Sequence, residues 1–509
     1  MIAFDFAVSV NEIIVQGAKN RLTDVEFIEN EIQRFLNSKR RRDMINGERY
    51  FKGEHDILHR KRTMIGENGK LENVENVPNN RVVDNQYKKM VNQKVNYLLG
   101  QPVTIQSDNT QYAETIKQFL NKRFLRLIKN VGRDSLNCGV GWLFLHYDEQ
   151  GEFQFKRFKP YEIIAGWKDD EHTSLEYAIR LYEIISYEGK NEKTVQKVEV
   201  YDEKGIHRFI LDGSRLIPDF DPYNDIKTHE PYFTVIQGED ELDFNWSRIP
   251  LIPFKYNTEE IPLIRNVKPL QDGLNLILSN FENNMEEDAR NTILVLVNYD
   301  GENLAEFRKN LSTYGAVKLK TVDGAAGDLR TLQVEVNAAN YQAIIEIFKK
   351  AIIENAMGYD AKDDRLGGNA NQLNIMSMYS DIDLDANEME TEYQASFEEL
   401  IRFINLHLAN TGQGDFDGVE VEVIFNRDML ISESEIITNI QNSVGILSEE
   451  TLIAQHPWVD DPLKELERVK EEKAEAVAEA QKQFGDAAFN PAVGGKETVV
   501  TEEYQSTKE

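Results

Sequence analysis

Neither glycine nor proline occurs between residues 372 and 410. Proline breaks helix interiors and glycine weakens them, so a stretch without either favours one long helix. At 1.5 Å per residue, about 39 residues would span roughly 58 Å. Apolar side chains recur along this stretch at helical spacing, namely Leu373, Met376, Ile382, Met389, Tyr393, Phe397, Leu400, Ile404 and Leu408. The sequence therefore predicts that a long helix organises the second half of the chain.

The positions of the prolines separate two halves of different character. Ten of the 13 prolines lie between Pro78 and Pro269, and the next is Pro457. We therefore expect an α+β fold with a mixed first half and a mainly helical second half. The elements expected in the first half are helical structure in 1–62, a helix over 80–99 stopped at Gly100 and Pro102, a helix over 110–137, a hairpin over 139–158 turning at 148–151, and strands at 176–187, 195–201, 206–211 and 232–236.

Two amphipathic helices are expected to bracket a small insert. Each carries one apolar stripe, which favours packing of the two helices against each other. The stripe residues are Leu270, Leu274, Ile277, Phe281 and Met285 on the first helix, and Tyr341, Ile344, Ile345, Phe348 and Ile352 on the second. The insert is predicted to hold strands at 292–297, 316–319 and 329–336 and a helix at 302–311.

The C-terminal region is predicted to be helical and then to lose its fold. Ser432 and Ser448 read as helix N-caps, and a charged helix is expected from Pro462 to about residue 483. Residues 484–509 lack the apolar spacing that a packed structure needs.

The chain has a formal net charge of −30, from 58 basic and 88 acidic side chains. A field this negative excludes a general DNA-binding surface, because phosphate contacts require cations. Two segments concentrate the charge. Residues 371–400 hold eight acids and no Lys or Arg, and residues 430–509 carry 7 basic against 17 acidic side chains. Among the acids of the long helix, Asp381, Asp383, Asp385 and Glu388 are those we single out.

The usual signatures of catalysis and of cofactor binding are missing. There is no GxxxxGK[ST] phosphate loop and no GxSxG, HExxH or CxxC motif, and the sequence implies no cofactor. Cys138 is the one cysteine, so no disulfide can form within the chain, and we expect a small buried side chain there. The longest apolar run is 293–297, whereas a membrane-spanning helix needs about 20 such residues, so no membrane span is expected.

Three polar groups leave alternatives open. His55 and His59 are four residues apart, as two ligands on one helix face would be, but we expect a surface turn after Gly53. The basic run 39–42 could bind nucleic acid, although a solvated or intersubunit helix face is the preferred interpretation. The carboxylates of Asp360, Asp363 and Asp364 could hold a metal, which would make the chain a metal-dependent nuclease or another phosphoryl-transfer enzyme.

The order of several short motifs resembles the portal proteins of tailed bacteriophages, of the type found in long-tailed phages of Gram-positive bacteria. Each motif is weak alone, and their shared order over roughly residues 45–475 carries the resemblance. The chain has YFKGEHDI at 50–57, NNRVVDNQY at 79–87, YLLGQP at 97–102, GVGW at 139–142 with KP at 159–160, and ILSEET at 446–451 with HPWVDDP at 456–462.

The resemblance implies a ring, normally of twelve subunits, at one vertex of the capsid, with double-stranded DNA passing through a central channel. The parts that it implies are, in chain order, a wing (1–265), a first stem helix (266–290), a clip (291–337), a second stem helix (338–357), a tunnel loop (358–371), a long helix and strand returning to the wing (372–429), a crown (430–483) and a tail expected to be disordered (484–509).

The resemblance also implies roles and partners. The clip would dock the terminase and later the head-to-tail adaptor, and scaffolding and major capsid proteins would be further partners. Such a protein is not an enzyme; it assembles in the host cytoplasm and resides in the virion. We expect Lys362 and Arg365 to be the DNA-facing cations of the tunnel loop, with Asp360, Asp363 and Asp364 limiting adhesion. Lys349 and Lys350 are weaker candidates.

Overall fold

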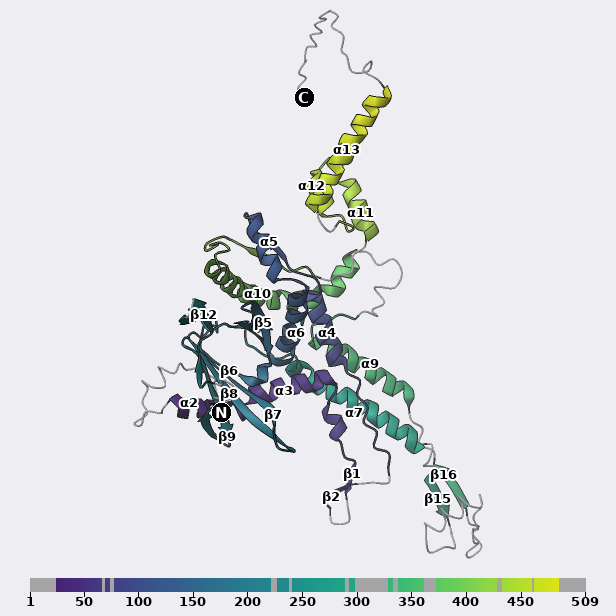
Figure 1. Ribbon diagram of the computed structural model, residues 1–509. Helices are drawn as coiled ribbons and strands as arrows, with labels where there is room; N and C mark the ends of the chain where they lie inside the picture. The colour runs from purple at the N-terminus through teal and green to yellow at the C-terminus, as the bar shows by residue number, and fades with distance from the viewer. Residues whose placement is uncertain are drawn as a thin grey trace, which may run out of the picture. The chain divides into compact units, whose positions relative to one another are not determined.

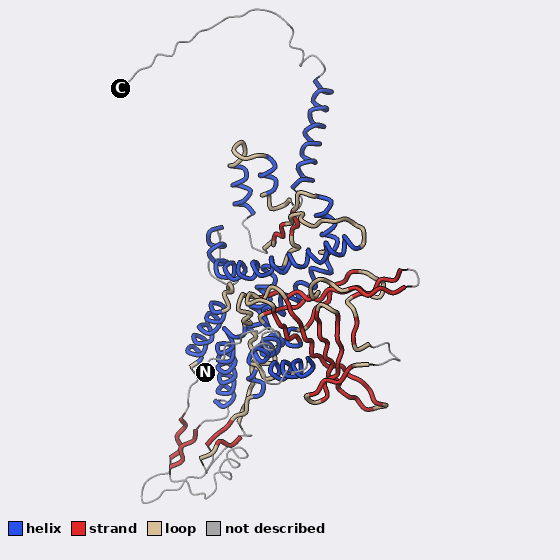
Figure 2. Tube along the Cα trace, turned by 90° about the vertical axis from the view of Figure 1, so that its left-hand side faces the viewer, coloured by secondary structure: helices blue, strands red, loops and turns tan. Residues whose placement is uncertain are grey.

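The computed structural model describes residues 24–65, 69–73, 77–220, 227–237, 240–288, 293–297, 328–332, 337–360, 372–427, 433–459 and 462–484. The chain forms two compact units. The first contains residues 1–362 and 378–429, and the second contains residues 363–377 and 430–509. Helices and strands are mixed in the first unit (Figures 1 and 2), in agreement with the expected α+β class.

The N-terminal part of the first unit is mainly helical. It contains α2 (Asp24–Leu36), α3 (Lys39–Lys52), the 3₁₀ turn η1 (Asp56–His59), α4 (Gln86–Leu99), α5 (Thr110–Phe119) and α6 (Lys122–Cys138), with a short hairpin of β1 (Thr63–Ile65) and β2 (Leu71–Asn73). The part of the 1–62 prediction before residue 24 lies outside the described residues. Gly100 follows α4 in a right-handed conformation, so it does not form the left-handed cap that a helix-ending glycine usually forms.

The single helix expected over 110–137 is wrong, because the chain breaks at Leu120 and Asn121. Asn121 is extended, and its side-chain oxygen accepts hydrogen bonds from the backbone N–H groups of Arg123 and Phe124. Asparagine is a strong N-cap residue, so it starts a new helix where the apolar spacing alone suggests continuity.

An antiparallel sheet of strands β6 to β11 forms the main β layer of the first unit. The strands expected at 176–187, 195–201 and 206–211 are confirmed within it. The path runs β10-β9-β8-β7-β6, and β11 pairs with β9. The bounds are β6 (Ile163–Trp167), β7 (Leu175–Glu188), β8 (Asn191–Asp202), β9 (Gly205–Asp212), β10 (Arg215–Pro218) and β11 (His229–Glu230). Helix α2 packs on this sheet through the fully buried Ile32.

A three-stranded sheet connects the helices to this layer. The predicted hairpin forms β4 (Val140–Tyr147) and β5 (Phe153–Phe158), and Trp142 lies opposite Phe158. The third strand, β14 (Leu251–Lys255), pairs with β4 from more than a hundred residues further along the chain. The remaining short elements here are η2 (Pro160–Glu162), the hairpin β12 (Phe233–Gln237) with β13 (Asp240–Phe244), and the pair β3 (Thr104–Gln106) with β17 (Glu422–Ile424).

The junction between α6 and β4 is closed by the segment around Glu260. Its carboxylate is buried and accepts a 2.6 Å hydrogen bond from His172, and it also pairs with Arg40. Burial opposes ionisation of Glu260, but the charge of Arg40 and the bond from His172 outweigh it and lower the pKa to about 2. Arg41 donates to the carbonyl oxygen of Tyr161. The basic run 39–42 is therefore partly engaged within the chain and is not a fully solvated face.

Helices α7 (Ile264–Asp288) and α9 (Ala338–Asn355) and most of α10 (Gln372–Asn410) dominate the rest of the first unit. Helix α7 begins before Pro269, earlier than the expected helix. Helix α9 begins at the predicted residue, and α10 confirms the long helix over the predicted range. Between α7 and α9, β15 (Ile293–Val297) pairs antiparallel with β16 (Asp328–Leu332). The other elements predicted for the insert, at 302–311 and 316–319, lie outside the described residues.

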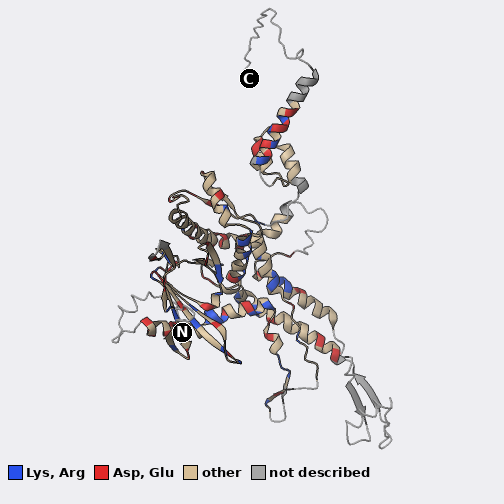
Figure 3. Cartoon of the chain, viewed as in Figure 1, with Lys and Arg blue, Asp and Glu red and all other residues tan. Residues whose placement is uncertain are grey.

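The second unit contains α11 (Glu433–Asn442), α12 (Glu449–Ala454) and α13 (Pro462–Phe484). Ser448 caps α12 as predicted, because its hydroxyl accepts a hydrogen bond from the backbone N–H of Thr451. Helices α12 and α13 pack together, and Lys473 pairs with Glu449. Acidic and basic side chains alternate along α13 (Figure 3). The start of α11 at Ser432 and the tail beyond residue 484 lie outside the described residues.

Candidate functional site

Helices α7 and α9 lie side by side (Figure 1) and form the helix pair expected from their apolar stripes. A Cβ at Gly273 would come within 2.5 Å of the Phe348 ring, so the absence of a side chain lets this ring approach α7. Further along, the rings of Phe281 and Tyr341 are 4.9 Å apart. Asn284 donates a 2.8 Å hydrogen bond to the hydroxyl of Tyr341. The two helices are thus joined along their length by aromatic and polar contacts.

The predicted stripe residues differ in how well the chain covers them. Leu274 and Ile352 are fully buried, whereas Met285 and Ile344 are 50% and 41% exposed. The partly buried members are Leu270, Ile277, Phe281, Tyr341, Ile345 and Phe348. Two apolar residues outside the predicted set are also exposed, Leu276 by 42% and Ile347 by 64%. The helix pair therefore keeps apolar surface that the described residues do not cover.

A polar stripe on α7, which the sequence analysis missed, is buried more completely than the apolar one. Gln271, Asn275, Ser279 and Asn283 follow one another at intervals of four residues, and all are essentially inaccessible. Four residues of an α-helix rise about 6.0 Å, so the four side chains stand in one row along the helix. Buried polar groups of this kind require hydrogen-bond partners.

The partners are backbone groups of residues 79–85, here called the strap. The strap runs antiparallel to α7 and has no regular secondary structure. Its N–H groups at residues 80, 82 and 84 donate to Asn283 (2.7 Å), Ser279 (2.9 Å) and Asn275 (3.1 Å). Two residues of extended chain span about 6.6 Å, close to the 6.0 Å of four helix residues, so both repeats stay in register. The polar row therefore accepts the hydrogen bonds that a neighbouring strand would accept from the strap in a β-sheet.

Gln271 continues this row to the start of α4. Its side-chain oxygen accepts from the N–H of Tyr87 (3.0 Å), and its side-chain nitrogen donates to the carbonyl oxygen of Asp84 (2.8 Å). The first turn of a helix has N–H groups without intrahelical partners, so Gln271 satisfies one of them. Lys349 of α9 forms a 2.8 Å ion pair with Asp84. The strap is thus held by both helices of the pair.

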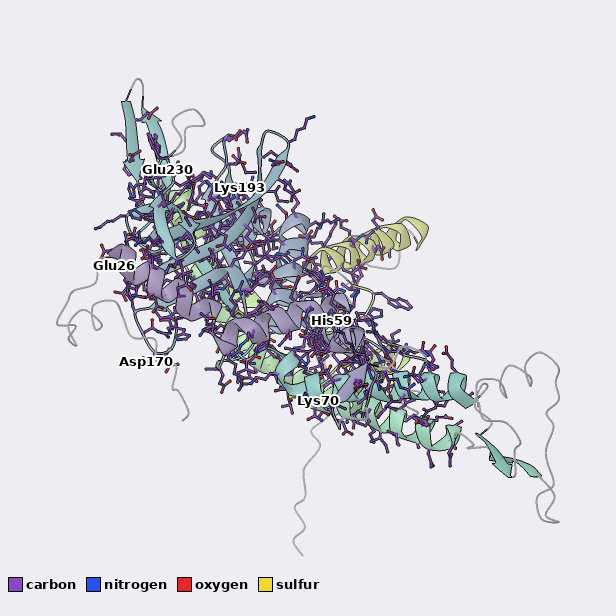
Figure 4. All side chains as sticks on the ribbon, turned by 90° about the horizontal axis from the view of Figure 1, so that it is seen from below. Glu26, His59, Lys70, Asp170, Lys193 and Glu230 are labelled. Atoms are coloured by element: carbon purple, nitrogen blue, oxygen red, sulfur yellow. The ribbon has the colours of Figure 1, made fainter. Side chains whose placement is uncertain are left out.

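The expected surface turn is wrong for His55, which is fully buried beneath the strap. Its ring stacks on Tyr50 at 4.4 Å, and its Nε2 lies 3.0 Å from the Tyr50 carbonyl oxygen. That oxygen can only accept, so Nε2 carries the hydrogen and Nδ1 accepts from the Asn275 amide at 2.7 Å. Burial lowers the pKa of His55, which favours this neutral form. His59 is exposed on the turn that contacts α7 (Figure 4).

Asn275→Leu tests the polar row. The substitution removes the acceptor of the Asp84 N–H and the donor to His55, and each unsatisfied buried group costs about 1–3 kcal/mol. We expect the free energy of unfolding to fall by about 2–4 kcal/mol in urea titrations followed by tryptophan fluorescence. Asn96→Leu makes the same change at an exposed position of α4, and we expect it to stay within about 0.5 kcal/mol of the wild type. Equal effects of the two variants would contradict a structural role for the row.

The acids of α10 differ in whether a cationic side chain pairs with them. Asp383, Asp385, Glu390, Glu392 and Glu399 all have cationic partners. These are Lys94 to Asp385 (2.6 Å), Arg427 to Asp383 and to Glu390 (2.7 Å), Lys255 to Glu392 (3.6 Å), and Arg248 (2.8 Å) and Arg402 (3.0 Å) to Glu399. Asp381 and Glu388 are exposed, and no ion pair of theirs is found in the described parts of the chain. The stretch is therefore not a continuous acidic wall.

The predicted loop residues are only partly described. Asp360 is the last described residue before the gap, and Lys362, Asp363, Asp364 and Arg365 lie outside the described residues. Lys350 forms a 3.8 Å pair with Glu354 of its own helix. The positions of the loop cations stay predictions.

Cys138 is buried as expected, and burial raises the pKa of its thiol. Within the described ranges, no cluster of three or more His, Cys, Asp or Glu side chains could hold a metal ion. No helix in the same ranges is long and apolar enough to span a bilayer. The contacts found around α7, α9 and the strap are packing contacts and hydrogen bonds between parts of this chain.

Comparison with known proteins identifies the family. The family described as "Phage portal protein, SPP1 Gp6-like" matches residues 36–479. The portal protein of Bacillus phage SPP1 is 30% identical over 470 residues, which cover 91% of this chain and 89% of that protein. The portal protein of Clostridium phage phiCD119 is 27% identical over 451 residues, 86% of this chain and 94% of that protein.

The chain belongs to the SPP1 Gp6-like family of phage portal proteins. A role in packaging viral DNA follows from this membership, as does a place in the virion capsid. The family is a structural one, which favours the portal interpretation over the nuclease alternative built on residues 360–364. The resemblance inferred from the short motifs is confirmed.

Proposed function

We propose that this portal protein assembles into a ring of about twelve copies around a central channel at one capsid vertex, and that double-stranded DNA enters and leaves through it. The observation that carries the proposal is the exposed apolar surface of the α7–α9 pair, at Leu276, Ile344 and Ile347. A helix pair in a soluble protein is expected to cover such residues, and a neighbouring copy would do so. Head-to-tail contacts of this kind generate a ring when the rotation closes.

The proposed parts follow the chain order. Helices α7 and α9 form the stem, residues 291–337 the clip, residues 358–371 the tunnel loop, residues 1–265 most of the wing, residues 372–429 the return to the wing, and residues 430–483 the crown. The clip docks the terminase and later the head-to-tail adaptor, and scaffolding and major capsid proteins surround the ring. The hydrolysis of ATP belongs to the terminase, so this chain acts without catalysis and without a cofactor.

A conduit must guide DNA without retaining it. Each cation that contacts a phosphate adds affinity, and many such contacts would slow transit. The pairing on α10 supports this proposal, because partners within the chain occupy several cations, Lys94, Arg427 and Lys255 among them. The proposed DNA-facing cations are Lys362 and Arg365 of the tunnel loop. The carboxylates of Asp360, Asp363 and Asp364 limit the affinity of these cations for the DNA phosphates.

Ring formation and the loop assignment can be tested in one set of variants. Negative-stain images of the purified protein should show rings with a central hole, and monomers or dimers alone would contradict the ring. Lys362→Ala with Arg365→Ala should keep the ring but reduce the DNase-protected DNA that particles package or retain by severalfold. Lys122→Ala with Arg123→Ala removes two exposed charges at the start of α6 and should leave packaging unchanged. Full packaging and retention by the loop variant would overturn the loop assignment.

A further inference from the structure

Side chains on one face of α4 contact three consecutive residues just after the end of α9, an arrangement here called the grip. The gripping side chains are Met90, Gln93 and Lys94, which share a helix face because they are three and four residues apart. The gripped residues, 357–359, include the first two residues of the proposed tunnel loop, 358–371. The described chain continues for one residue beyond them, to Asp360, so the grip lies at the base of the loop.

Gln93 binds Tyr359 as a short piece of β-sheet would. Its side-chain oxygen accepts from the N–H of Tyr359 at 3.1 Å, and its side-chain nitrogen donates to the carbonyl oxygen of Tyr359 at 2.8 Å. Both backbone groups of one residue are thus satisfied by one amide. No other side chain can replace this pairing in full, because only an amide presents a donor and an acceptor side by side at this length.

The two residues before Tyr359 are held as closely. Lys94 donates to the carbonyl oxygen of Met357 at 3.2 Å, and Met357 has a left-handed backbone with φ of 49°. A Cβ at Gly358 would come within 2.6 Å of the Met90 sulfur and 2.9 Å of the Gln93 oxygen, so this position has no room for a side chain. A residue other than glycine keeps a left-handed backbone conformation only where the surrounding contacts hold it there.

The grip is also connected to α10. The ammonium group of Lys94 pairs with Asp385 at 2.6 Å, and both side chains are almost fully buried. Asp385 accepts a further 2.6 Å hydrogen bond from Tyr256. The ring of Tyr359 lies 4.5 Å from that of Tyr379, which in turn stacks on Tyr97 of α4 at 5.6 Å. Residues 357–359 are therefore fixed between α4 and α10.

We propose that Gln93 is the positioning residue of the tunnel loop, and that its amide, with Lys94 beside it, sets the point from which the loop departs. This inference rests on the proposed function, since the loop matters for DNA only if it faces the channel. The anchor itself is a statement about the protein alone and can be measured without DNA.

Amide hydrogen exchange of the full-length ring tests the anchor. Gln93→Leu removes both hydrogen bonds to Tyr359, and we expect the Tyr359 amide to exchange at least about tenfold faster. Gln93→Glu keeps an acceptor for that N–H but sets a second acceptor against the Tyr359 carbonyl oxygen, so we expect exchange between that of the wild type and that of Gln93→Leu. The amide of Gly358 bonds to the carbonyl oxygen of Ile353 at 2.9 Å and serves as an internal reference that should change little. Gln111→Leu, at an exposed position of α5, should leave both amides unchanged.

Unchanged exchange of Tyr359 in Gln93→Leu would overturn the anchor. DNA retention in particles gives the second measurement. Faster exchange with several-fold weaker retention supports both the anchor and the DNA-facing loop. Faster exchange with full retention upholds the anchor and counts against the loop as the DNA contact, so the two failures are distinguishable.

Discussion

Gly139→Ala is expected to lower the free energy of unfolding by about 2–5 kcal/mol. Gly139 ends α6 in a left-handed conformation with φ of 87°, which costs an alanine about 1–2 kcal/mol. A Cβ there would also overlap the carbonyl oxygen of Glu260. That oxygen belongs to backbone, which cannot turn aside as a side chain can, and such overpacking adds about 1–3 kcal/mol.

Gly151→Ala provides the matched control. Gly151 has a similar φ of 78°, but no atom lies within 4 Å of a Cβ built there. Its alanine variant should therefore lose only the conformational part, about 1–2 kcal/mol. Urea unfolding followed by tryptophan fluorescence measures both variants. If they lose the same amount, the close approach of the Glu260 segment to α6 has no energetic consequence and the packing at this junction is not as described.

Lys94→Met is expected to cost about 3–5 kcal/mol, because it leaves the buried carboxylate of Asp385 without its cation. Burial lowers the pKa of Lys94, while the nearby charge of Asp385 acts in the opposite direction. Methionine fills nearly the same volume, so the loss reports the charge and the hydrogen bonds more than packing. Urea unfolding is again the measurement. Lys89→Met, at an exposed position of the same helix, should be nearly neutral.

The double variant Lys94→Met with Asp385→Asn separates the unpaired charge from other causes. An amide at residue 385 can still accept from Tyr256, and no charge is left buried. We expect the double variant to recover at least half of the stability that Lys94→Met loses. A double variant as unstable as the single one would mean that the loss arises from the Met357 carbonyl or from packing, and not from the carboxylate.

Elements with a local signal were predicted well from the sequence. The hairpin of β4 and β5, the long helix α10 and the cap at Ser448 each depend on spacing or on residue types within a few positions. The helix break at Asn121 was also a local signal, but the regular apolar spacing of 110–137 masked it. His55 was missed because a histidine after a glycine turn carries no sign of burial, and its partner Asn275 lies 220 residues away.

The sequence by itself determined many of the helices and strands, the two apolar stripes and, through short motifs in a shared order, the family. Only the tertiary structure decided what the polar residues do. The burial of Gln271, Asn275, Ser279 and Asn283 is seen only when the strap is placed on them, and the pairing of the acids of α10 only when Lys94 and Arg427 reach them. The physical reason is that periodicity reports which side of an element a residue faces, whereas the partner on that side comes from a distant part of the chain.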